Sequence, residues 1–569
     1  MFFVALATDY DGTLAEGGRV APEVIDTLKA VRRSGRKLIL VTGRELPDLK
    51  SVFLDLELFD AVVVENGALL YDPATREETL LTEGPPPAFV ARLKELGVSP
   101  LGIGRSIVAT REPHETEVLR VIRDMGLELH IIFNKGAVMV LPGDVNKAWG
   151  LKHALHRLGL SPHNVVGIGD AENDQVFLSA CGCGAAVANA LPSVKEKADL
   201  VVAAYGGGVI ELASQLIGSD LRDLPHRMSN ALPALGTRSD GSVVHLDPFA
   251  TTLVAGTSGG GKSTMVTALL EQMRSLDFQF CVVDPEGDYA ELPDAVVIGS
   301  AKQEPTPEAV LDLLTRPDVS VVVNLLAIDP ADRPAWLAGF LPVISKLRAE
   351  TGRPHWLVLD EVHHCLPADW NAASIVLPKE MPATLAVTVH PDQVARGFLD
   401  LVTTMVAVGD RARAVIDTLC SLQGRGLPTG AEGPIRRGEA LALGRSGHVD
   451  LVTASKPKER QRRHVRKYAQ GELGEDKSFY FRGPRGQLNL RAQNLQMFLQ
   501  IAAGVDDRTW QHHLRLGDYS RWFREAIKDE ALAAEAAEVE RDRSTSAEGS
   551  RQRIKALVEQ RYTAPAKKR

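Results

Sequence analysis

The chain has 569 residues, of which 44% are hydrophobic and 24% charged, with a net charge of −8. At ~150 residues per domain, this length predicts three or four soluble globular domains. The charge excludes a protein that is strongly basic overall. Five cysteines without paired CxxC motifs indicate neither a disulfide framework nor a zinc site. No apolar run approaches the ~20 residues of a membrane span, so we expect a cytoplasmic protein without membrane contact.

The first predicted strand, residues 2–8, ends in two acidic residues. Asp9 and Asp11 are two apart, so both side chains point to the same side at the carboxyl end of the strand. Asp9 has the chemistry to attack a phosphoryl group, and Asp11 has the chemistry to protonate the leaving oxygen. A second buried strand, within 36–44, ends in Thr42 and Gly43, a hydroxyl and an open backbone suited to phosphate.

Further strands and acids follow in order. Residues 61–70 form a third strand and turn, and Lys147 begins a helical stretch. Residues 165–174 form a fourth strand that ends in Asp170 and Asp174, four apart and on one face of a helix that begins there. Carboxylates of this kind are suitable Mg²⁺ ligands.

This set of motifs resembles the haloacid dehalogenase (HAD) phosphatases of the Cof-like branch, over residues 1–215. The matching motifs are DYDGT, VTGR, ENGA, Lys147, GDAEND, VANALPSVKEKAD and GGGV. The resemblance implies a phosphatase of small-molecule phosphate esters, with sugar phosphates and phosphoglycolate as family-level examples. The roles it implies are Asp9 as the nucleophile that becomes an aspartyl-phosphate, Asp11 as general acid/base, Thr42 and Lys147 on the phosphoryl group, and Asp9, the Asp11 carbonyl and Asp170 on Mg²⁺, supported by Asp174. A degenerate, non-catalytic copy is the alternative.

The family's α/β cap falls at about residues 82–142. Apolar spacing predicts helices at 85–97 and 113–126, and short strands lie at 106–110, 129–133 and 137–141. The cap covers the site and selects the substrate in this family. Candidate anion contacts are Arg105, Arg111, His130 and Lys135, although a solvated face is the more ordinary interpretation of each one singly.

After a linker at 216–240, a second parallel α/β domain is predicted at 241–455. The segment GTSGGGKST (256–264) fits the G-x-x-x-x-G-K-[ST] phosphate loop, between an apolar run and a helix-compatible run from 262 to 273. The phosphate-binding glycines are Gly256, Gly259, Gly260 and Gly261, which turn backbone N–H groups toward phosphate. Lys262 then reaches the β- and γ-phosphates, and Ser263 ligates Mg²⁺ with Thr264 beside it.

Other strands of this domain also end in chemically useful residues. Strands are predicted within 278–289, 319–326, 355–364, 384–390 and 404–410. Behind a phosphate loop, Asp360 is expected to hold Mg²⁺ through water and Glu361 to polarise the attacking water. His390 is a candidate γ-phosphate sensor, or a satisfied strand-end histidine.

The segments GTSGGGKST, VVDPEGDY, WLVLDEVHH and TVHPDQVA together resemble the HerA/FtsK class of ring-forming ATPases, over about 240–450. The DPEGDY segment, with Asp284 and Glu286, is the most discriminating. The resemblance implies ATP as ligand, a RecA-like fold, a hexamer, an arginine supplied by the neighbouring subunit and often DNA translocation. Arg411 and Arg413 are the candidate arginines. His390 departs from the glutamine common in the class, and no long basic pore loop is evident.

Residues 456–569 are predicted to be a mostly helical region. The basic run 456–467 has three interpretations: a contact to DNA phosphates, a contact to the anionic substrate, or a solvated helix face. An aromatic strand and an apolar helix are expected within 479–505, and an extended helix after Ala534. Tyr519, Trp522, Phe523 and Ile527 are expected to form a core stripe.

The sequence thus predicts an α/β protein with two chemistries, a Mg²⁺-dependent HAD phosphatase and a P-loop ATPase, in a homo-oligomer for which a hexamer is favoured. Three purposes compete. ATP turnover gates or powers the phosphatase, or the ATPase is a nucleic-acid motor with an accessory phosphatase in defence or repair, or ATP organises a structural assembly.

Overall fold

The computed structural model describes residues 2–134, 136–223, 232–257, 260–369, 377–431, 435–445, 447–457, 473, 477–527 and 529–562. The chain divides into two compact units, Met1–Glu286 with Asp294–Lys456, and Gly287–Pro293 with Pro457–Arg569. Within the described ranges, no helix is both long and apolar enough to cross a membrane.

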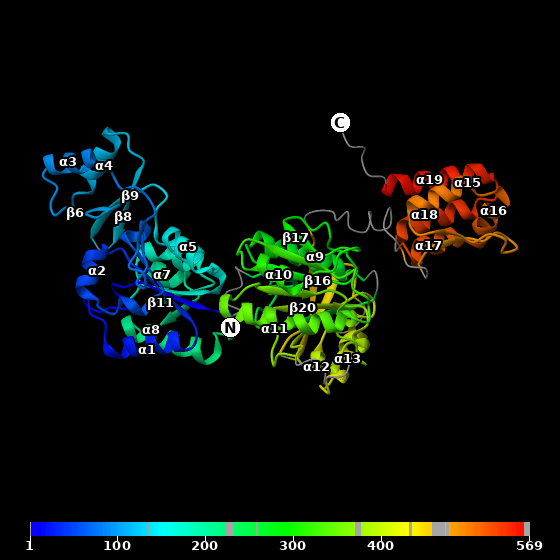
Figure 1. Ribbon diagram of the computed structural model, residues 1–569, viewed down its shortest axis with the longest axis horizontal. Coiled ribbons are helices and arrows are strands. Elements are labelled where there is room, and N and C mark those ends of the chain that lie inside the picture. The colour runs from blue at the N-terminus through cyan, green and yellow to red at the C-terminus, as the bar shows by residue number, and fades with distance from the viewer. Residues whose placement is uncertain are drawn as a thin grey trace. The chain divides into compact units, whose positions relative to one another are not determined.

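The N-terminal domain is built on an eight-stranded sheet in the order β12-β11-β10-β1-β2-β3-β4-β5 (Figure 1). The strands are β1 (Ala5–Thr8), β2 (Lys37–Val41), β3 (Ala61–Val64), β4 (Leu69–Tyr71), β5 (Glu78–Leu80), β10 (Val165–Gly169), β11 (Cys183–Val187) and β12 (Leu200–Val202). The helices are α1 (Pro22–Arg33), α2 (Leu46–Val52), α5 (Lys147–Leu158), α6 (Gln175–Ala180), α7 (Pro192–Lys197) and α8 (Tyr205–Ser219). Strand β1 pairs in parallel with both β2 and β10, so the strand order reverses at β1, where ligands bind in open α/β sheets.

The cap is inserted between β5 and α5. Its antiparallel sheet has the order β6-β7-β9-β8, with strands β6 (Gly102–Ile103), β7 (Val108–Arg111), β8 (Leu129–Asn134) and β9 (Ala137–Pro142). Helices α3 (Pro87–Glu95) and α4 (Glu115–Asp124) pack on it through a core that includes Phe89, Leu93 and Val121 (Figure 1). The structure agrees with the predicted helices and three strands of the cap, and adds β6, which is too short to show a pattern.

The central domain has a sheet in the order β14-β13-β24-β23-β21-β15-β20-β19-β16-β18-β17. The strands are β13 (Ala234–Thr237), β14 (Val243–His245), β15 (Thr251–Gly256), β16 (Phe280–Asp284), β17 (Ala295–Ile298), β18 (Ser320–Asn324), β19 (Trp356–Leu359), β20 (Thr384–Thr388), β21 (Thr404–Val408), β22 (Thr429–Gly430), β23 (Glu439–Leu443) and β24 (His448–Ala454). The helices are α9 (Lys262–Ser275), α10 (Pro307–Leu314), α11 (Arg333–Thr351), α12 (Arg396–Leu399) and α13 (Ala412–Leu422). The strands from β21 to β17 are parallel, and β15 lies between β20 and β21.

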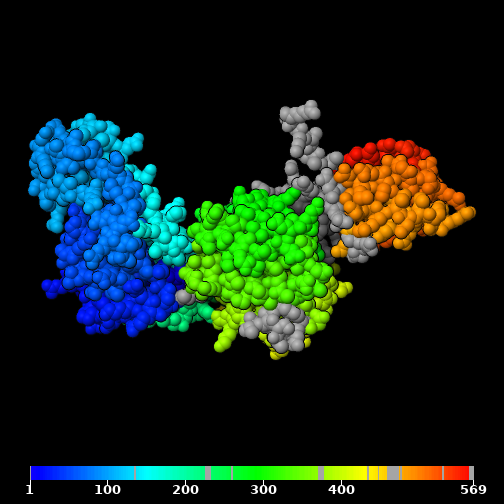
Figure 2. All heavy atoms as spheres, viewed as in Figure 1, coloured from blue at the N-terminus to red at the C-terminus, as the bar shows by residue number. Residues whose placement is uncertain are grey.

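The C-terminal module combines a short hairpin with helices and forms a compact body, orange to red in Figure 2. Its elements are β25 (Phe479–Phe481), β26 (Leu490–Ala492), α15 (Leu495–Gly504), α16 (Asp507–Leu516), α17 (Asp518–Glu525), α18 (Glu530–Arg541) and α19 (Ala547–Tyr562). The predicted stripe of Tyr519, Trp522, Phe523 and Ile527 is buried in its core, which confirms that prediction.

The extended helix expected after Ala534 is wrong, because two helices, α18 and α19, occupy this stretch. Asp542 interrupts the pattern between them. Its carboxylate accepts hydrogen bonds from the Ser544 N–H and from the Thr545 hydroxyl. Such local side-chain bonds compete with continued helix.

Candidate active sites

Three carboxylates gather at the carboxyl edge of the N-terminal sheet; we call Asp9, Asp170 and Asp174 the carboxylate cluster. Asp9 follows β1 and Asp170 follows the neighbouring strand β10. One oxygen from each of the three lies within 4.8 Å of the others, and all three side chains are buried. The Asp174 carboxylate also accepts the N–H groups of Asp170 and Ala171, each at 2.9 Å, which holds the loop in place.

Lys147 lies against this cluster. Its Nζ donates to Asp9 Oδ1 and to Asp174 Oδ1, each at 2.5 Å, and its side chain is 1% exposed. It is the first residue of α5, which Asn146 caps. A side chain at Gly67 would lie 2.1 Å from the Asn146 carbonyl, so the glycine of the ENGA turn allows α5 to begin here.

Burial governs the ionisation of these groups. The pKa of Asp9 is raised to about 8. Burial is the main cause of the rise; the charge of Lys147 opposes it, and the charge of Asp174 adds to it. Burial alone would lower the pKa of Lys147, but the charges of Asp174 and Asp9 outweigh it and raise that pKa. We therefore take Lys147 as a permanent ammonium and Asp9 as the group that needs further positive charge to stay ionised.

The chemistry of the carboxylate cluster fits a divalent cation. Three carboxylates against the single ammonium of Lys147 place excess negative charge in a buried site, which is costly without a counter-ion. A few carboxylate oxygens, completed by water and substrate, are what Mg²⁺ prefers.

The carboxylate of Asp11 is held by Arg44. Arg44 Nε and Nη2 donate to its two oxygens at 2.6 and 2.7 Å, and Nη1 donates to Asp48 at 2.6 Å. The hydrogen bond to Asp11 is the main cause of a raised Arg44 pKa. The Arg44 N–H also donates to the buried Thr42 hydroxyl at 3.2 Å. The VTGR motif contains Arg44, but sequence reasoning gave it no role, because its partner lies in another motif.

Two buried amides face each other beside Gly43. Asn173 Nδ2 donates to Asn66 Oδ1 at 3.0 Å, and a Cβ on Gly43 would lie 3.9 Å from that oxygen. Asn66 Nδ2 and Asn173 Oδ1 are buried without a hydrogen-bond partner. An unsatisfied buried polar atom costs ~1–3 kcal/mol, so this pair favours a polar ligand group at this point. Sequence reasoning assigned neither asparagine a role.

Two of the contacts between the cap and the N-terminal domain lie close to the site. Met139 of β9 lies against Gly43, since a Cβ there would be 3.6 Å from its methyl group. Glu65 is buried, and its carboxylate accepts the N–H groups of Arg105 and Ser106 at 3.0 and 2.7 Å. Glu65 therefore ties the cap backbone to the ENGA turn.

The four cap residues predicted as candidate anion contacts differ in their surroundings. The Arg105 guanidinium pairs with Glu78 at 2.7 Å, and Arg111 is exposed. His130 has a buried Nδ1 without a partner, while Lys135 lies outside the described residues.

The segment predicted to be a phosphate loop joins β15 to α9 in the central domain. A side chain at Gly256 would lie 2.3 Å from the Val408 carbonyl, so β15 and β21 need glycine there. Lys262 Nζ donates to the Gly256 and Thr257 carbonyls at 2.9 and 3.2 Å. Gly260 and Gly261 complete the described part of the loop, Ser263 and Thr264 lie in the first turn of α9, and Gly259 lies outside the described residues.

Acidic residues follow the strands near β15. Asp284 ends β16, and Asp360 and Glu361 follow β19. Glu361 has a left-handed backbone, with φ 39° and ψ 53°, and its buried Oε2 lies 3.4 Å from His363 Nδ1. The pKa of Glu361 is raised, mainly by burial. The charge of Lys262 opposes this rise, and the charge of Glu286 adds to it. A strained backbone at an acidic residue that follows a strand is typical of a functional position.

Two histidines missed by sequence reasoning adjoin these acids. His363 Nδ1 lies 3.0 Å from the Thr388 hydroxyl, and its ring centroid is 5.3 Å from that of the exposed His390. His364 Nε2 lies 3.8 Å from a Glu286 oxygen. The sequence signal that could have identified these two histidines is their place in the LDEVHH motif, directly after the acids that follow β19.

The two arginines predicted as candidates to act on a neighbouring subunit differ in their contacts and exposure. Arg413 donates to Asp417 and to the carbonyls of Pro428 and Ala431, so its guanidinium holds the local fold. Arg411 is exposed and follows β21, the neighbour of β15. Of the two candidates, Arg411 is therefore the one with an exposed side chain.

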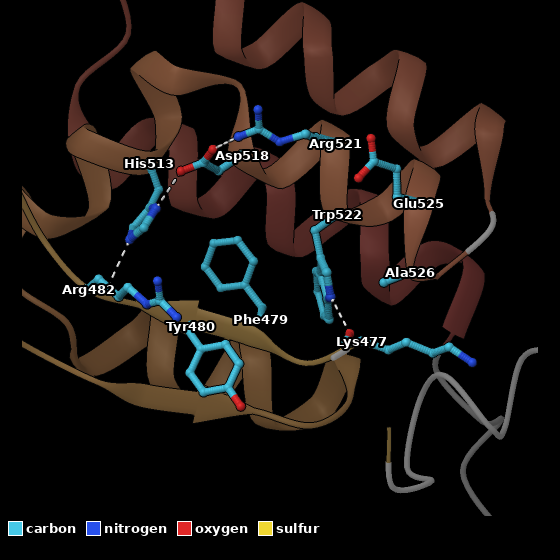
Figure 3. A pocket seen from close by; sticks show the side chains of 10 residues that line it. All are labelled: Lys477, Phe479, Tyr480, Arg482, His513, Asp518, Arg521, Trp522, Glu525 and Ala526. Atoms are coloured by element: carbon cyan, nitrogen blue, oxygen red, sulfur yellow. Dashed lines mark hydrogen bonds and ion pairs between the residues drawn. The ribbon is translucent and has the colours of Figure 1, made fainter. Parts of the chain in front are cut away.

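The C-terminal module has a pocket of about 360 Å³ between β25 and α17 (Figure 3). Its lining residues are Lys477, Phe479, Tyr480, Arg482, His513, Asp518, Arg521, Trp522, Glu525 and Ala526. Several of their polar groups bind each other: His513 Nε2 accepts the Arg482 N–H at 3.1 Å, while Asp518 binds both His513 Nδ1 at 2.7 Å and Arg521. These contacts stabilise the module, and we assign no chemistry to this pocket.

The fold and the carboxylate cluster of the N-terminal domain define a hydrolase of the haloacid dehalogenase-like class. The family model described as haloacid dehalogenase-like hydrolase matches residues 6–97 and 116–209. The phosphoglycolate phosphatase of Methanothermobacter thermautotrophicus is 30% identical over 227 residues, covering 38% of this chain and 99% of that protein. That of Methanopyrus kandleri is 32% identical over 224 residues, covering 37% and 95%. Through its N-terminal domain, the chain belongs to the haloacid dehalogenase-like hydrolase family.

Two further matches were found. A solved haloacid dehalogenase-like hydrolase from Bacteroides thetaiotaomicron covers 38% of this chain and 99% of its own, with 19% identity and a TM-score of 0.34. The family model described as helicase HerA, central domain, matches residues 249–353 of the central domain. The two family models confirm both family resemblances expected from the sequence.

Proposed function

We propose that the N-terminal domain is a Mg²⁺-dependent phosphatase that works through an aspartyl-phosphate, and that the central domain binds and hydrolyses ATP. The observation that carries the first part is the buried contact of Lys147 with Asp9 inside the carboxylate cluster. This contact supports the proposed roles, with Asp9 as the nucleophile and Lys147 as the fixed cation that binds a phosphoryl oxygen.

In the first step, an Asp9 oxygen attacks phosphorus while the ester P–O bond breaks, and the leaving oxygen takes a proton from Asp11. In the second step, water attacks the same phosphorus and gives its proton to Asp11. The bond from phosphorus to Asp9 breaks, and inorganic phosphate leaves. Lys147 and Thr42 bind the transferred group. Arg44 binds both oxygens of the ionised Asp11, which is the form that accepts the proton from water in the second step.

Mg²⁺ would be held by Asp9, Asp170, Asp174 and, as the family implies, the Asp11 carbonyl. When bound, it supplies positive charge that offsets the phosphoryl oxygens and favours ionised Asp9. The substrate is a small-molecule phosphate ester, and phosphoglycolate is the first to test because relatives are named for it.

In the central domain, Lys262 would bind the β- and γ-phosphates, and Ser263, Thr264 and Asp360 would serve Mg²⁺. Glu361 polarises the attacking water. Asp284, Glu286 and His390 line the same strand ends. A cytoplasmic homo-oligomer, with a hexamer favoured, would complete the site with Arg411 of the next subunit.

A second candidate function is a nucleic-acid motor with an accessory phosphatase, favoured by the match to the HerA central domain. The basic run 456–467, most of which lies outside the described residues, is its candidate contact. DNA-stimulated ATP hydrolysis, with binding that weakens steeply as salt rises, would support this function. Absence of DNA binding at low salt would remove it and leave ATP-gated catalysis or an ATP-organised assembly.

The deciding experiment exchanges one residue in each site. Asp9→Asn keeps the side-chain shape but removes the nucleophile, so it should abolish phosphate-ester hydrolysis while ATP hydrolysis survives. Lys262→Ala should abolish ATP hydrolysis, and its effect on the phosphatase reports whether ATP gates that reaction. The molecular mass of the protein with ATP and Mg²⁺, measured by light scattering, serves as the control for assembly. A strict monomer would contradict the proposed ring.

A further inference from the structure

A buried junction joins the N-terminal and central domains within one compact unit. Arg353, just before β19, is fully buried, and its Nη2 donates to the Gly159 carbonyl at 2.7 Å. Asn164 Nδ2 donates to the Phe2 carbonyl at 2.7 Å and to the Gly352 carbonyl at 3.3 Å. These polar groups lie where both domains cover them, so the contact is part of the folded core.

A second part of the junction is centred on His163. Its ring stacks on Phe278, with centroids 3.9 Å apart and an angle of 21°. Its Nε2 lies 2.6 Å from the Leu276 carbonyl. Burial lowers the His163 pKa, so the neutral ring donates its N–H there. An exposed ion pair, Arg222 with Glu380, closes the rim.

The junction lies at one end of several elements whose other ends carry residues of the proposed sites. In the N-terminal domain, β10 lies between Asn164 and Asp170, and α5 begins at Lys147 and ends just before Gly159. In the central domain, β16 begins two residues after Phe278 and ends at Asp284, and β19 lies between Arg353 and Asp360. Helix α9 begins at Lys262 and ends just before Leu276. With 12 and 14 residues, α5 and α9 span ~18 and ~21 Å at 1.5 Å per residue.

We propose that this junction couples the two sites, so that nucleotide in the central domain changes the affinity of the N-terminal domain for phosphate. The proposal rests on the function proposed above for both sites. Closure of β16 and β19 around nucleotide moves Phe278 and Arg353 against His163 and Gly159. Because α5 and β10 begin or end at those contacts, the movement reaches Lys147 and the carboxylate cluster. Such coupling is reciprocal, so phosphate must change nucleotide affinity by the same factor.

The test uses the full chain with Mg²⁺. Inhibition of p-nitrophenyl phosphate hydrolysis by inorganic phosphate is measured with and without a saturating non-hydrolysable ATP analogue. We expect the inhibition constant to change by about fivefold or more. In reverse, saturating phosphate should change the dissociation constant of the analogue by the same factor. Equal constants in the native protein would overturn the coupling.

The route is tested with His163→Gln combined with Phe278→Leu. Glutamine keeps an N–H for Leu276 but removes the stacked ring. We expect each constant measured alone to stay within about twofold, and the coupling to fall below about twofold. Full coupling in this variant would overturn the junction as the route. If the double variant does not fold, Phe278→Leu alone carries the same test.

Arg222→Gln is the matched control, because it breaks only the exposed rim pair and should keep the coupling. Loss of coupling in Arg222→Gln while the double variant keeps it would overturn the assignment to the buried contacts. Failure of the native protein to bind the analogue or to hydrolyse the ester would remove the proposed function itself, and the coupling with it.

Discussion

Arg44 donates to both carboxylate oxygens of Asp11, from Nε at 2.6 Å and from Nη2 at 2.7 Å. A two-point contact of this kind fixes the plane of the carboxylate as well as its position. In the proposed mechanism, Asp11 gives a proton to the leaving oxygen and later accepts one from water. Its orientation would therefore bear on the rate of the proposed reaction, with Arg44 as a positioning residue.

Arg44→Lys is the first prediction. Lysine keeps the charge but offers a single ammonium in place of the fork. We expect kcat for phosphate-ester hydrolysis to fall about 10- to 100-fold with little change in KM, because misplacement of a catalytic group acts on the chemical step. Steady-state kinetics of the native protein and the variant measure both kcat and KM. Asp48→Asn, which removes only the outer contact of Arg44, should leave kcat within about twofold; equal losses in both variants would contradict the role.

The amide pair gives a second prediction. Asn66→Asp keeps the acceptor that Asn173 uses and suits the left-handed backbone at this position, with φ 55°. It replaces the unpartnered Nδ2 donor with an oxygen. If that donor binds substrate, kcat/KM should fall at least about tenfold, equivalent to ~1.4 kcal/mol. A native melting temperature would exclude a folding effect, and an unchanged kcat/KM would show that the donor does not face the ligand.

Whether a feature could be predicted from the sequence depends on how far apart in the chain the interacting residues lie. Apolar strands ending in Asp9, Asp170 or Glu361 carry local signals, since a strand's period and its terminal acids are visible in a few residues. The contacts of Arg44 with Asp11 and of Asn66 with Asn173 join segments 33 and 107 residues apart. No local pattern encodes such a pairing.

The junction between the domains was also invisible in the sequence. Arg353 looks like a solvated residue after a helix, yet it is fully buried against Gly159. Its burial depends on two domains folding against each other, 194 residues apart in the chain. The break between α18 and α19 was missed for the opposite reason, because the bonds of Asp542 are local but were outweighed by helix-favouring composition.

Glu361→Gln is the third prediction. The amide keeps the size of the side chain but cannot polarise water as a carboxylate does. ATP hydrolysis should fall about 100-fold or more, while binding of a fluorescent ATP analogue remains, because Lys262 and the loop are unchanged. Lys262→Ala is the matched control and should lose binding as well. ATP hydrolysis near the native rate in Glu361→Gln would assign the buried carboxylate a structural role.

The last prediction concerns His513 in the C-terminal module. Burial lowers its pKa to about 4, with the charges of His512 and Arg482 acting in the same direction. In the unfolded chain the pKa is about 6.5. Between these values the unfolded module binds more protons than the folded one, so the free energy of unfolding falls as pH drops from 6.5 toward 4. Protonation also removes the acceptor that Nε2 offers to the Arg482 N–H.

His513→Gln cannot take up this proton, so its stability should change less between pH 7 and pH 5 than that of the native protein. Pulse proteolysis in urea measures this, with the surviving fragment of residues 477–562 followed by mass. Working at pH 5 and above avoids the protonation of Asp506, whose pKa is lowered by its bonds to Thr509. The same loss of stability between pH 7 and pH 5 in both proteins would show that His513 does not control the pH response of the module.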